Sequence, residues 1–324
     1  MKIPILFLIF TRPDTTKQVF EEIRKAKPPR LYIASDGPRE NKEGEKERVE
    51  AVRKYVLEHI DWDCEVKTLF RDKNLGCGRA VSQAITWFFE NEEMGIILED
   101  DCLPSQSFFW FCEDMLEYYK NNDDIGMISG FNPFSNEINV NSSYFFSKYN
   151  LCWGWASWRR VWDKYDIEMK GWKNDRNGYL LKRFSNNHLV QKYWKHLFDI
   201  FYFKIDESGW DAQFSYLLFR ENKLTVVPSK NLIKNIGYGS DLSIHCIDKP
   251  PEHISKAKKE ELSFPLKHSE NILIDDKFDD MVEKIHFNIN FFTDFKLWSK
   301  FILGKNKNLR FFYNFVRNIY KKLK

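Results

Sequence analysis

Short apolar runs alternate with amphipathic stretches along the first 130 residues. Stretches such as 79–90 and 106–120 repeat apolar residues every three or four positions, which predicts helices that bury one face. Asp14 or Thr15 is expected to cap another helix, after the first apolar run. Strands alternating with helices are typical of an α/β domain with a mixed, mostly parallel sheet flanked by helices. The predicted strands of this region are residues 3–10, 31–34, 65–70, 95–98 and 125–129.

Beyond residue 130 the pattern is looser. Aromatic residues crowd positions 144–162, which predicts loops or short strands, and the Gly-rich segment 235–245 predicts a loop. Helices are expected at about 187–203 and 210–221, and a strand at 224–228. We divide the chain into a domain over 1–250 with halves that meet near 130, a linker and helical segment over 251–295, and a basic tail over 296–324.

Polar residues follow four of the predicted strands. They are Thr11-Arg12, Asp36-Gly37, the segment 71–74 and Glu99-Asp100-Asp101. Because parallel strands end at one edge of a sheet, and ligands in such folds bind beyond that edge, these residues predict a binding site. Arg79 adds to it, because it begins a helix behind Gly76 and Gly78, where backbone amides favour anions.

The three adjacent carboxylates Glu99, Asp100 and Asp101 suit a hard cation, Mg²⁺ or Mn²⁺. Such a cation commonly takes one or two protein carboxylates together with substrate phosphates, so the cluster predicts a metal–diphosphate site. His245, in the Gly-rich segment, is a second candidate ligand of the metal or contact of a phosphate. The alternatives are a solvated acidic turn that caps the next helix, and a structural histidine.

Composition narrows the class of protein. The 324 residues are 43% apolar and 17% aromatic, which is enough for a large core. Six cysteines without a CxxC pair indicate reduced thiols in a cytosolic protein. The apolar run at 3–10 is short and lacks a small-residue cleavage site, so we expect a core strand there and not a signal peptide. No apolar run approaches the roughly 18 residues that a spanning helix needs.

The charge is unevenly distributed. Nine of the 50 Lys and Arg residues lie in 296–324, which contains no acid, so the remaining 41 stand against 47 acidic residues. The acidic body does not favour nucleic acid as a partner. Residues 308–324 have the period of an amphipathic helix, which predicts a peripheral protein held through the 296–324 tail on an anionic membrane, at its cytoplasmic face. The alternative is a terminal helix packed on the core.

Several stretches resemble, in the same order, one enzyme family. A strand that ends in Glu99-Asp100-Asp101, with Phe108-Phe109 in the next helix, resembles the DxD metal motif of nucleotide-sugar glycosyltransferases of GT-A fold. The similarity is to the N-acetylglucosaminyltransferase I type and related bacterial sugar transferases, and it covers roughly residues 3–246. The other matching stretches are Phe10-Thr11-Arg12, Ser35-Asp36-Gly37, 127–132, 151–155, Trp210-Asp211 and 235–239.

The resemblance implies roles for these residues. Thr11 and Arg12 would hold the nucleotide, Asp36 would recognise the base, and Asp101 would bind the metal. Glu99 and Asp100 would contact the ribose or hold the loop. The aromatic platform for a sugar or acceptor would be formed by Trp153, Gly154, Trp155 and Trp210.

Asp211 would act as the general base of an inverting transfer, because attack on the anomeric carbon requires a carboxylate to take the acceptor's proton. Here the sequence departs from the family's pattern, since the acid that follows this step is replaced by Ala212.

The sequence therefore predicts a glycosyltransferase that uses Mn²⁺ or Mg²⁺. It would move a hexosyl or N-acetylhexosaminyl group from a nucleotide-diphosphate sugar, expected to be a UDP-sugar, to a glycan or lipid-linked glycan. A sugar-1-phosphate nucleotidyltransferase is one alternative, although its Gly-rich loop is replaced here by Phe10-Thr11-Arg12-Pro13. The other alternative is a nucleotide- or glycan-binding module without catalysis.

Overall fold

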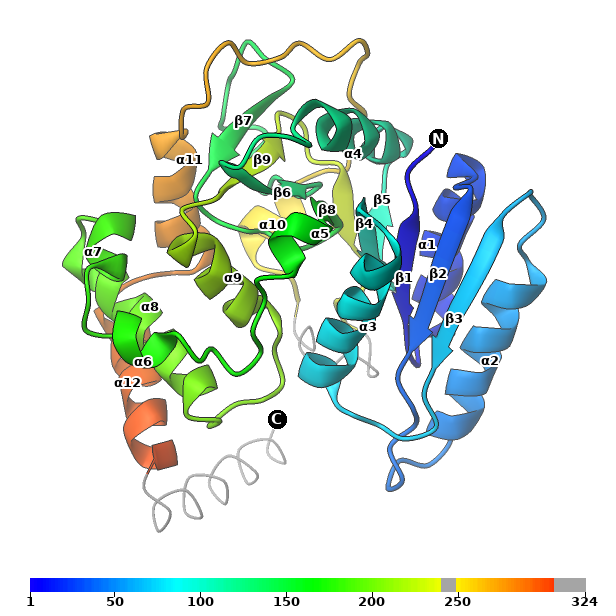
Figure 1. Ribbon diagram of the computed structural model, residues 1–324, viewed down its shortest axis with the longest axis horizontal. Helices are drawn as coiled ribbons and strands as arrows, with labels where there is room; N and C mark the ends of the chain where they lie inside the picture. Colours follow the sequence, from blue (N-terminus) through cyan, green and yellow to red (C-terminus); the bar gives the residue numbers. More distant parts are fainter. Residues whose placement is uncertain (240–248, 306–324) are drawn as a thin grey trace. The chain divides into compact units, whose positions relative to one another are not determined.

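The chain forms two compact units in a computed structural model that describes residues 1–239 and 249–305 (Figure 1). Unit 1 consists of Met1–Tyr165 and Asn222–Asp279, and unit 2 consists of Asp166–Glu221 and the chain after Asp279. The division made from the sequence instead keeps Asp166–Glu221 inside one domain over 1–250, because nothing in the composition near 166 or 221 is typical of a linker. The divisions near 250 and 295 stay predictions.

Unit 1 is built on one mixed sheet. In the described residues this sheet has eight strands, in the order β3-β2-β1-β4-β8-β6-β9-β7, and a separate antiparallel pair joins β5 to β10. The first four strands of this order are parallel, and β7 and β8 are antiparallel to their neighbours. The strands are β1 Ile5–Ile9, β2 Arg30–Ser35, β3 Glu65–Phe70, β4 Met94–Glu99, β5 Cys102–Pro104, β6 Ile125–Ser129, β7 Tyr144–Ser147, β8 Trp155–Trp158, β9 Leu224–Pro228 and β10 Ile233–Asn235.

Helices flank this sheet, which confirms the predicted fold class (Figure 1). One group brings α1 beside α2 and α4, and another brings α3 against β1, β2 and α5. The apolar side chains that these helices turn inward, such as Phe20 and Phe88, are fully buried. The helices of unit 1 are α1 Pro13–Ala26, α2 Glu45–Glu58, α3 Cys77–Asn91, α4 Gln106–Tyr118, α5 Arg159–Trp162 and α10 Glu252–Lys256.

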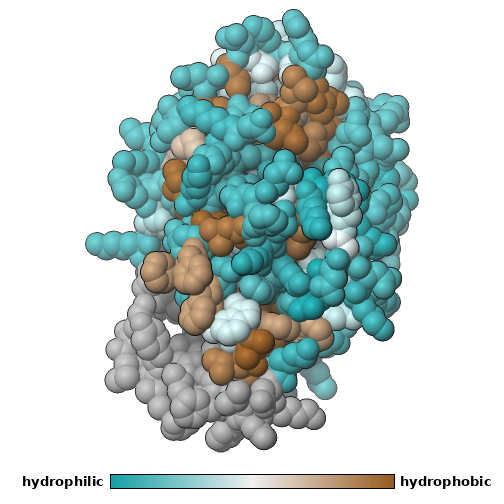
Figure 2. Space-filling model, turned by 90° about the vertical axis from the view of Figure 1, so that its left-hand side faces the viewer, coloured by the Kyte–Doolittle hydropathy of each residue, from teal (hydrophilic) through white to brown (hydrophobic). Residues whose placement is uncertain are grey.

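Unit 2 is helical in its described part, and α8 packs against α7, α9 and α12. The helices predicted at 187–203 and 210–221 are confirmed as α8 and α9. Figure 2 faces the side on which α12 lies, and brown or tan residues are visible near its top as well as in its lower half. The elements are α6 Trp172–Asp175, α7 Leu180–Phe184, α8 His188–Tyr202, α9 Asp211–Arg220, the π-helix η1 Val282–His286 and α12 Phe291–Lys305, while α11 Asp276–Met281 crosses between the ranges of the two units.

Some predictions fall outside the described residues. These are the metal or phosphate contact of His245 and the amphipathic helix over 308–324. The cysteines that the structure describes form no disulfide with one another; they are Cys64, Cys77, Cys102, Cys112 and Cys152. Among the helices of the described ranges, none has both the length and the apolar character needed to cross a bilayer.

Candidate functional site

The polar ends of β1 and β4 meet at the point where the strand order changes direction. The sheet runs β3-β2-β1 and then continues with β4. β1 therefore lies between β2, the next strand in the chain, and β4, which comes much later in the chain. Both strands run parallel, with Leu8 paired to Glu99. Such a switch point is where open α/β sheets bind ligands. The residues that follow these two strands therefore define the candidate site.

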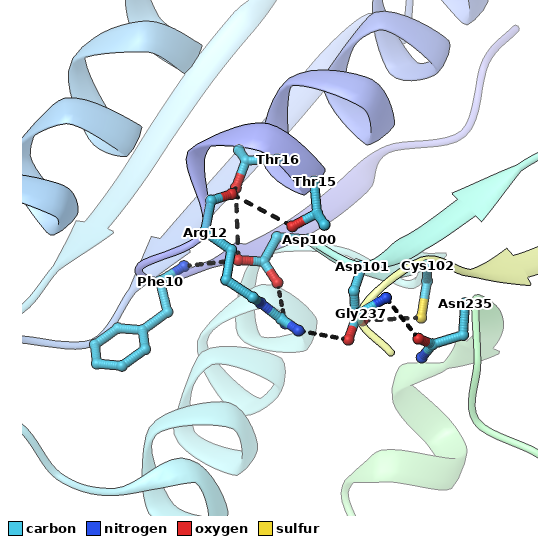
Figure 3. A network of polar contacts seen from close by, with 9 residues as sticks. All are labelled: Phe10, Arg12, Thr15, Thr16, Asp100, Asp101, Cys102, Asn235 and Gly237. Atoms are coloured by element: carbon cyan, nitrogen blue, oxygen red, sulfur yellow. Dashed lines mark hydrogen bonds and ion pairs between the residues drawn. The ribbon is translucent and has the colours of Figure 1, made fainter. Parts of the chain in front are cut away.

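Arg12 joins the two strand ends (Figure 3). Its Nη1 donates to Oδ2 of Asp101 at 2.7 Å, and its Nη2 donates to Oδ1 of Asp100. The backbone at Arg12 is fixed because its carbonyl accepts from the N–H and Oγ1 of Thr16, at 3.0 and 2.7 Å. The helix begins at Pro13, whose ring presets the first helical φ and whose missing N–H costs no hydrogen bond. The guanidinium is thus held by a rigid helix start.

Asp100 is the buried member of this network, with 2% of its surface exposed. Its Oδ2 accepts from the Phe10 N–H at 3.2 Å and from Thr16 Oγ1 at 3.5 Å. Burial raises the pKa of the Asp100 carboxyl to about 6, against the opposing charge of Arg12. Burial also acts to lower the pKa of Arg12, but the charges of Asp100 and Asp101 outweigh it and raise that pKa. Arg12 therefore stays cationic, and Asp100 anchors it.

Asp101 is the carboxylate of the network that is more open to solvent. Its side chain is 11% exposed, against 3% for Asp100. Within the described residues no group of three or more His, Cys, Asp or Glu side chains forms a ready cage for a metal. A Mg²⁺-type ion commonly takes only one or two protein carboxylates and completes its shell with water and phosphate oxygens. Asp101 could serve as one such ligand, and Glu99 lies half-buried at the end of β4.

The segment 235–239 lies directly over Asp101. The β5–β10 pair fixes its start by placing Asn235 opposite Cys102, and the Ile236 N–H donates to the Asp101 carbonyl at 2.8 Å. Gly237 follows, and a Cβ on it would stand 2.4 Å from Asp101 Oδ2 and 2.8 Å from Arg12 Nη1. A side chain there would force Asp101 or Arg12 to shift, so glycine lets the backbone approach the two charged groups (Figure 3).

The same segment brings an aromatic ring towards the site. The ring of Trp153 lies 4.5 Å from that of Phe131 and 6.1 Å from that of Tyr238, between centroids. Tyr238 is the neighbour of Gly237 in the chain, so Trp153 borders the segment over Asp101. Gly154 accepts a hydrogen bond from the Gly130 N–H at 2.8 Å. Trp155 instead lies in β8 and is 1% exposed, so its ring belongs to the core and does not face a ligand.

Asp36 organises the loop that follows β3. Its carboxylate accepts from the N–H groups of Gly37, Leu75 and Gly76, at 2.9 to 3.1 Å. Burial raises the pKa of Asp36, while these three N–H groups act to lower it. Gly76 has φ +79°, a conformation that glycine adopts without strain, and it directly precedes α3.

Two other predicted nucleotide contacts differ in exposure. Arg79 is exposed in the first turn of α3, whereas Thr11, after β1, is buried. The carboxylate of Asp36 thus already binds protein N–H groups, Arg79 is exposed on its helix, and Thr11 lies against the core.

Asp211 and Trp210 belong to unit 2. Asp211 is exposed at the first residue of α9, where its negative charge is favourable to the helix dipole. Burial, and secondarily the charge of Asp211, raise the pKa of Tyr193 to about 12. Trp210 is 4% exposed, so its ring supports the start of α9 and is not open to a sugar. The aromatic platform predicted from the sequence is therefore reduced to Trp153.

Three residues of the site are missed by the sequence patterns. Thr16 fixes Arg12, Gly237 permits the close approach, and Arg53 donates to the carbonyls of Ser35, Asp36 and Arg71 at 2.7 to 3.3 Å. Gly237 lies in the Gly-rich segment, which was a usable signal. Thr16 and Arg53 occur inside ordinary amphipathic helices, so only the fold shows what they contact.

No protein-family model and no curated protein matches this chain. The solved structures that are similar to part of it include the following three. A mannosyltransferase from Pyrobaculum calidifontis, solved with GDP-Man and Mn²⁺, has 15% identity and a TM-score of 0.36 over 49% of this chain and 45% of its own. TarS of S. aureus, residues 1–349, has 11% identity and a TM-score of 0.39 over 72% of this chain and 59% of its own.

The third structure is the galactosyltransferase LgtC, in complex with donor and acceptor sugar analogues. It has 11% identity and a TM-score of 0.32 over 53% of this chain and 64% of its own. The chain thus spans less than two thirds of each of these proteins. A mannosyltransferase and a galactosyltransferase are among the structures that it resembles in part. With TM-scores below 0.5, the activity has to be argued from this chain's own residues.

Proposed function

We propose that the chain is a metal-dependent glycosyltransferase that uses a nucleotide-diphosphate sugar, with a UDP-sugar as the expected donor. The observation that carries this proposal is the network in which Arg12 bridges Asp100 and Asp101 at the β1/β4 switch point. A structural ion pair requires one carboxylate. Here the same guanidinium also pairs with a second carboxylate, Asp101, whose side chain is the more exposed of the two, in the place where such sheets bind nucleotides.

The charges of this network favour a further cation. Among the described residues, one guanidinium stands against two carboxylates, which leaves one negative charge without an equal partner in a largely buried place, and that is costly. Mn²⁺ or Mg²⁺ on Asp101 would reverse that sign and neutralise the charge that develops on a departing diphosphate. Arg12 would then be released in part from Asp101 and be available to the phosphates.

The remaining roles rest mainly on the resemblance of the motifs. Arg79, exposed at the start of α3, and Thr11 would contact the nucleotide, and Asp36 would shape the turn that receives the base. Glu99 would contact the ribose. Trp153, beside the segment over Asp101, would stack on the sugar or the acceptor.

Two parts of the proposal rest on the sequence resemblance and on composition. Asp211 would be the base of an inverting transfer of a hexosyl or N-acetylhexosaminyl group to a glycan or lipid-linked glycan. The acid-free stretch 296–324 would hold the enzyme on the cytoplasmic, inner face of the cell membrane.

A panel of nucleotide sugars, incubated with Mn²⁺ and without acceptor, tests the proposal through slow release of the nucleoside diphosphate. We expect release with one donor, its loss in the presence of a chelator, and at least a hundredfold reduction in Asp101→Ala. Asp123→Ala is the matched control, because that carboxylate is 91% exposed elsewhere on unit 1.

Two results would point to the alternatives. Pyrophosphate formation from a nucleoside triphosphate and a sugar 1-phosphate would identify a nucleotidyltransferase. Tight donor binding, with no release even when candidate acceptors are added, would identify a binding module.

A further inference from the structure

The helix α12 carries a row of apolar side chains on its outer side. Phe291, Phe295, Trp298 and Ile302 follow one another at intervals of four, three and four residues, which places them on one face of a helix. All four are exposed, and Phe291 is 70% exposed. We call them the α12 stripe. With a rise of about 1.5 Å per residue the stripe is roughly 16 Å long.

The stripe is pre-assembled. The ring centroids of Phe291 and Phe295 lie 6.4 Å apart, with the rings nearly parallel, and those of Phe295 and Trp298 lie 5.5 Å apart. Phe292, 80% exposed, packs edge-on against Phe291 and widens the stripe at its start. Isolated exposed apolar residues need no explanation, but a contiguous exposed patch marks an interaction surface.

Contacts on the other side of α12 keep the stripe turned outward. The carboxylate of Asp294 lies 2.7 Å from Nδ1 of His196. Lys300 donates to the carboxylate of Asp206 at 2.7 Å. Phe301 is buried, and Gly304 lies so close to Ile205 that a Cβ would stand 2.4 Å from its Cγ2. Because these contacts fix the rotation of the helix, the stripe cannot turn into the core of unit 2.

The charge of the surrounding chain selects the partner. From Lys296 to the last residue the sequence contains nine Lys and Arg and no acid. Lys296 and Lys305 are exposed on α12 itself. A helix that carries both exposed aromatic side chains and lysines suits the boundary between acyl chains and anionic headgroups, where the rings insert and the ammonium groups stay in the headgroup layer.

We infer that the α12 stripe inserts into the interface of an anionic bilayer and that unit 2 is thereby the membrane-docking part of the protein. This extends the membrane contact proposed above for 296–324 by assigning the apolar insertion to four described residues. It does not require catalysis, so it stands or falls separately from the proposed transferase activity.

The test is co-flotation of the full chain with vesicles, without donor or metal. One set contains only phosphatidylcholine and the other contains phosphatidylcholine with phosphatidylserine. We expect binding to the anionic vesicles, and a reduction of about tenfold or more in the variant with Phe291→Ser, Phe295→Ser and Trp298→Ser. The matched control is Leu273→Ser with Tyr179→Ser, two exposed apolar residues outside the stripe. We expect it to bind like the wild type.

Circular dichroism and thermal unfolding confirm that each variant is folded. Retention of full binding by the stripe variant would overturn the inference, because the basic tail alone would then carry the membrane contact. Absence of wild-type binding to anionic vesicles would also overturn it. A wild-type dimer in sedimentation, lost in the stripe variant without any vesicle binding, would show that a second copy covers this face.

Discussion

Arg12 places one guanidinium between two carboxylates that are largely buried, and its removal is the most informative perturbation of the site. Arg12→Met keeps much of the length of the side chain but removes the charge and both hydrogen bonds. Asp100 would then retain the Phe10 N–H at 3.2 Å and a weak contact from Thr16 at 3.5 Å. A carboxylate with 2% exposure would thus be left without its counter-charge.

The expected cost follows from that geometry. Removing one partner of a buried ion pair lowers the free energy of unfolding by about 3–5 kcal/mol. Arg12→Met with Asp100→Asn removes the stranded charge as well, so the double variant should regain about 2 kcal/mol or more of that loss. Arg24→Met, which breaks an ion pair with the half-exposed Asp61, is the control and should change stability little.

The loss should also depend on pH. The pKa of Asp100 is already raised by burial to about 6, against the opposing charge of Arg12. Without Arg12 it rises further above its unfolded value of about 3.9. A carboxyl whose folded pKa is raised loses stability as the pH rises through that pKa. The difference between wild type and Arg12→Met should therefore be larger at pH 8 than at pH 5.

Urea unfolding at both pH values, followed by far-ultraviolet circular dichroism, measures these differences. The reasoning would be refuted by a loss below about 1 kcal/mol, the range of a solvated surface pair. It would also be refuted if the loss were equal at both pH values, or if the double variant regained nothing.

Three further outcomes are expected. Gly237→Ala should weaken metal-dependent UDP binding about tenfold, because its Cβ would stand 2.4 Å from an Asp101 oxygen. Gly239→Ala is the control, because the space around Gly239 is open and the change should cost only backbone strain. Calorimetric titration of UDP compares the two variants. Asp36→Ala should increase hydrogen exchange of the 75–76 amides, as seen by mass spectrometry, with no change in exchange as the outcome against it. Burial acts to raise the pKa of Asp206, but the hydrogen bonds from Lys300 and Ser208 outweigh it and hold that pKa below its usual range. Asp206→Asn should therefore lower stability by about 1–2 kcal/mol at pH 7 and by less near pH 3, and equal losses at both pH values would contradict this.

Elements with strong local patterns were predictable from the sequence. The strands expected at 125–129 and 224–228 appear as β6 Ile125–Ser129 and β9 Leu224–Pro228. Both are short apolar runs that turn residues bound, so local signals suffice. The start of α1 differs from the prediction of a cap at Asp14 or Thr15, because Pro13 begins the helix and Arg12 occupies the cap position.

Features that depend on distant pairing could not be predicted. β8 Trp155–Trp158 enters antiparallel between β4 and β6, and nothing in its four apolar or small residues distinguishes a strand from a loop. For the same reason the sequence did not separate Trp153, beside the site, from Trp155, in the core. The convergence of Arg12 with Asp100 was predictable only as a meeting of strand ends; the bridging geometry depends on the order β1-β4.

The central claim is that Asp101 forms a metal–diphosphate site, and titration calorimetry of UDP tests it most directly. Asp101→Asn keeps the size of the side chain and an acceptor for Arg12 but removes the charge that a divalent cation needs. The account predicts that UDP binds the wild type only with Mn²⁺ and binds Asp101→Asn at least about tenfold more weakly. Equal UDP binding by both proteins, or binding that ignores Mn²⁺, would contradict it.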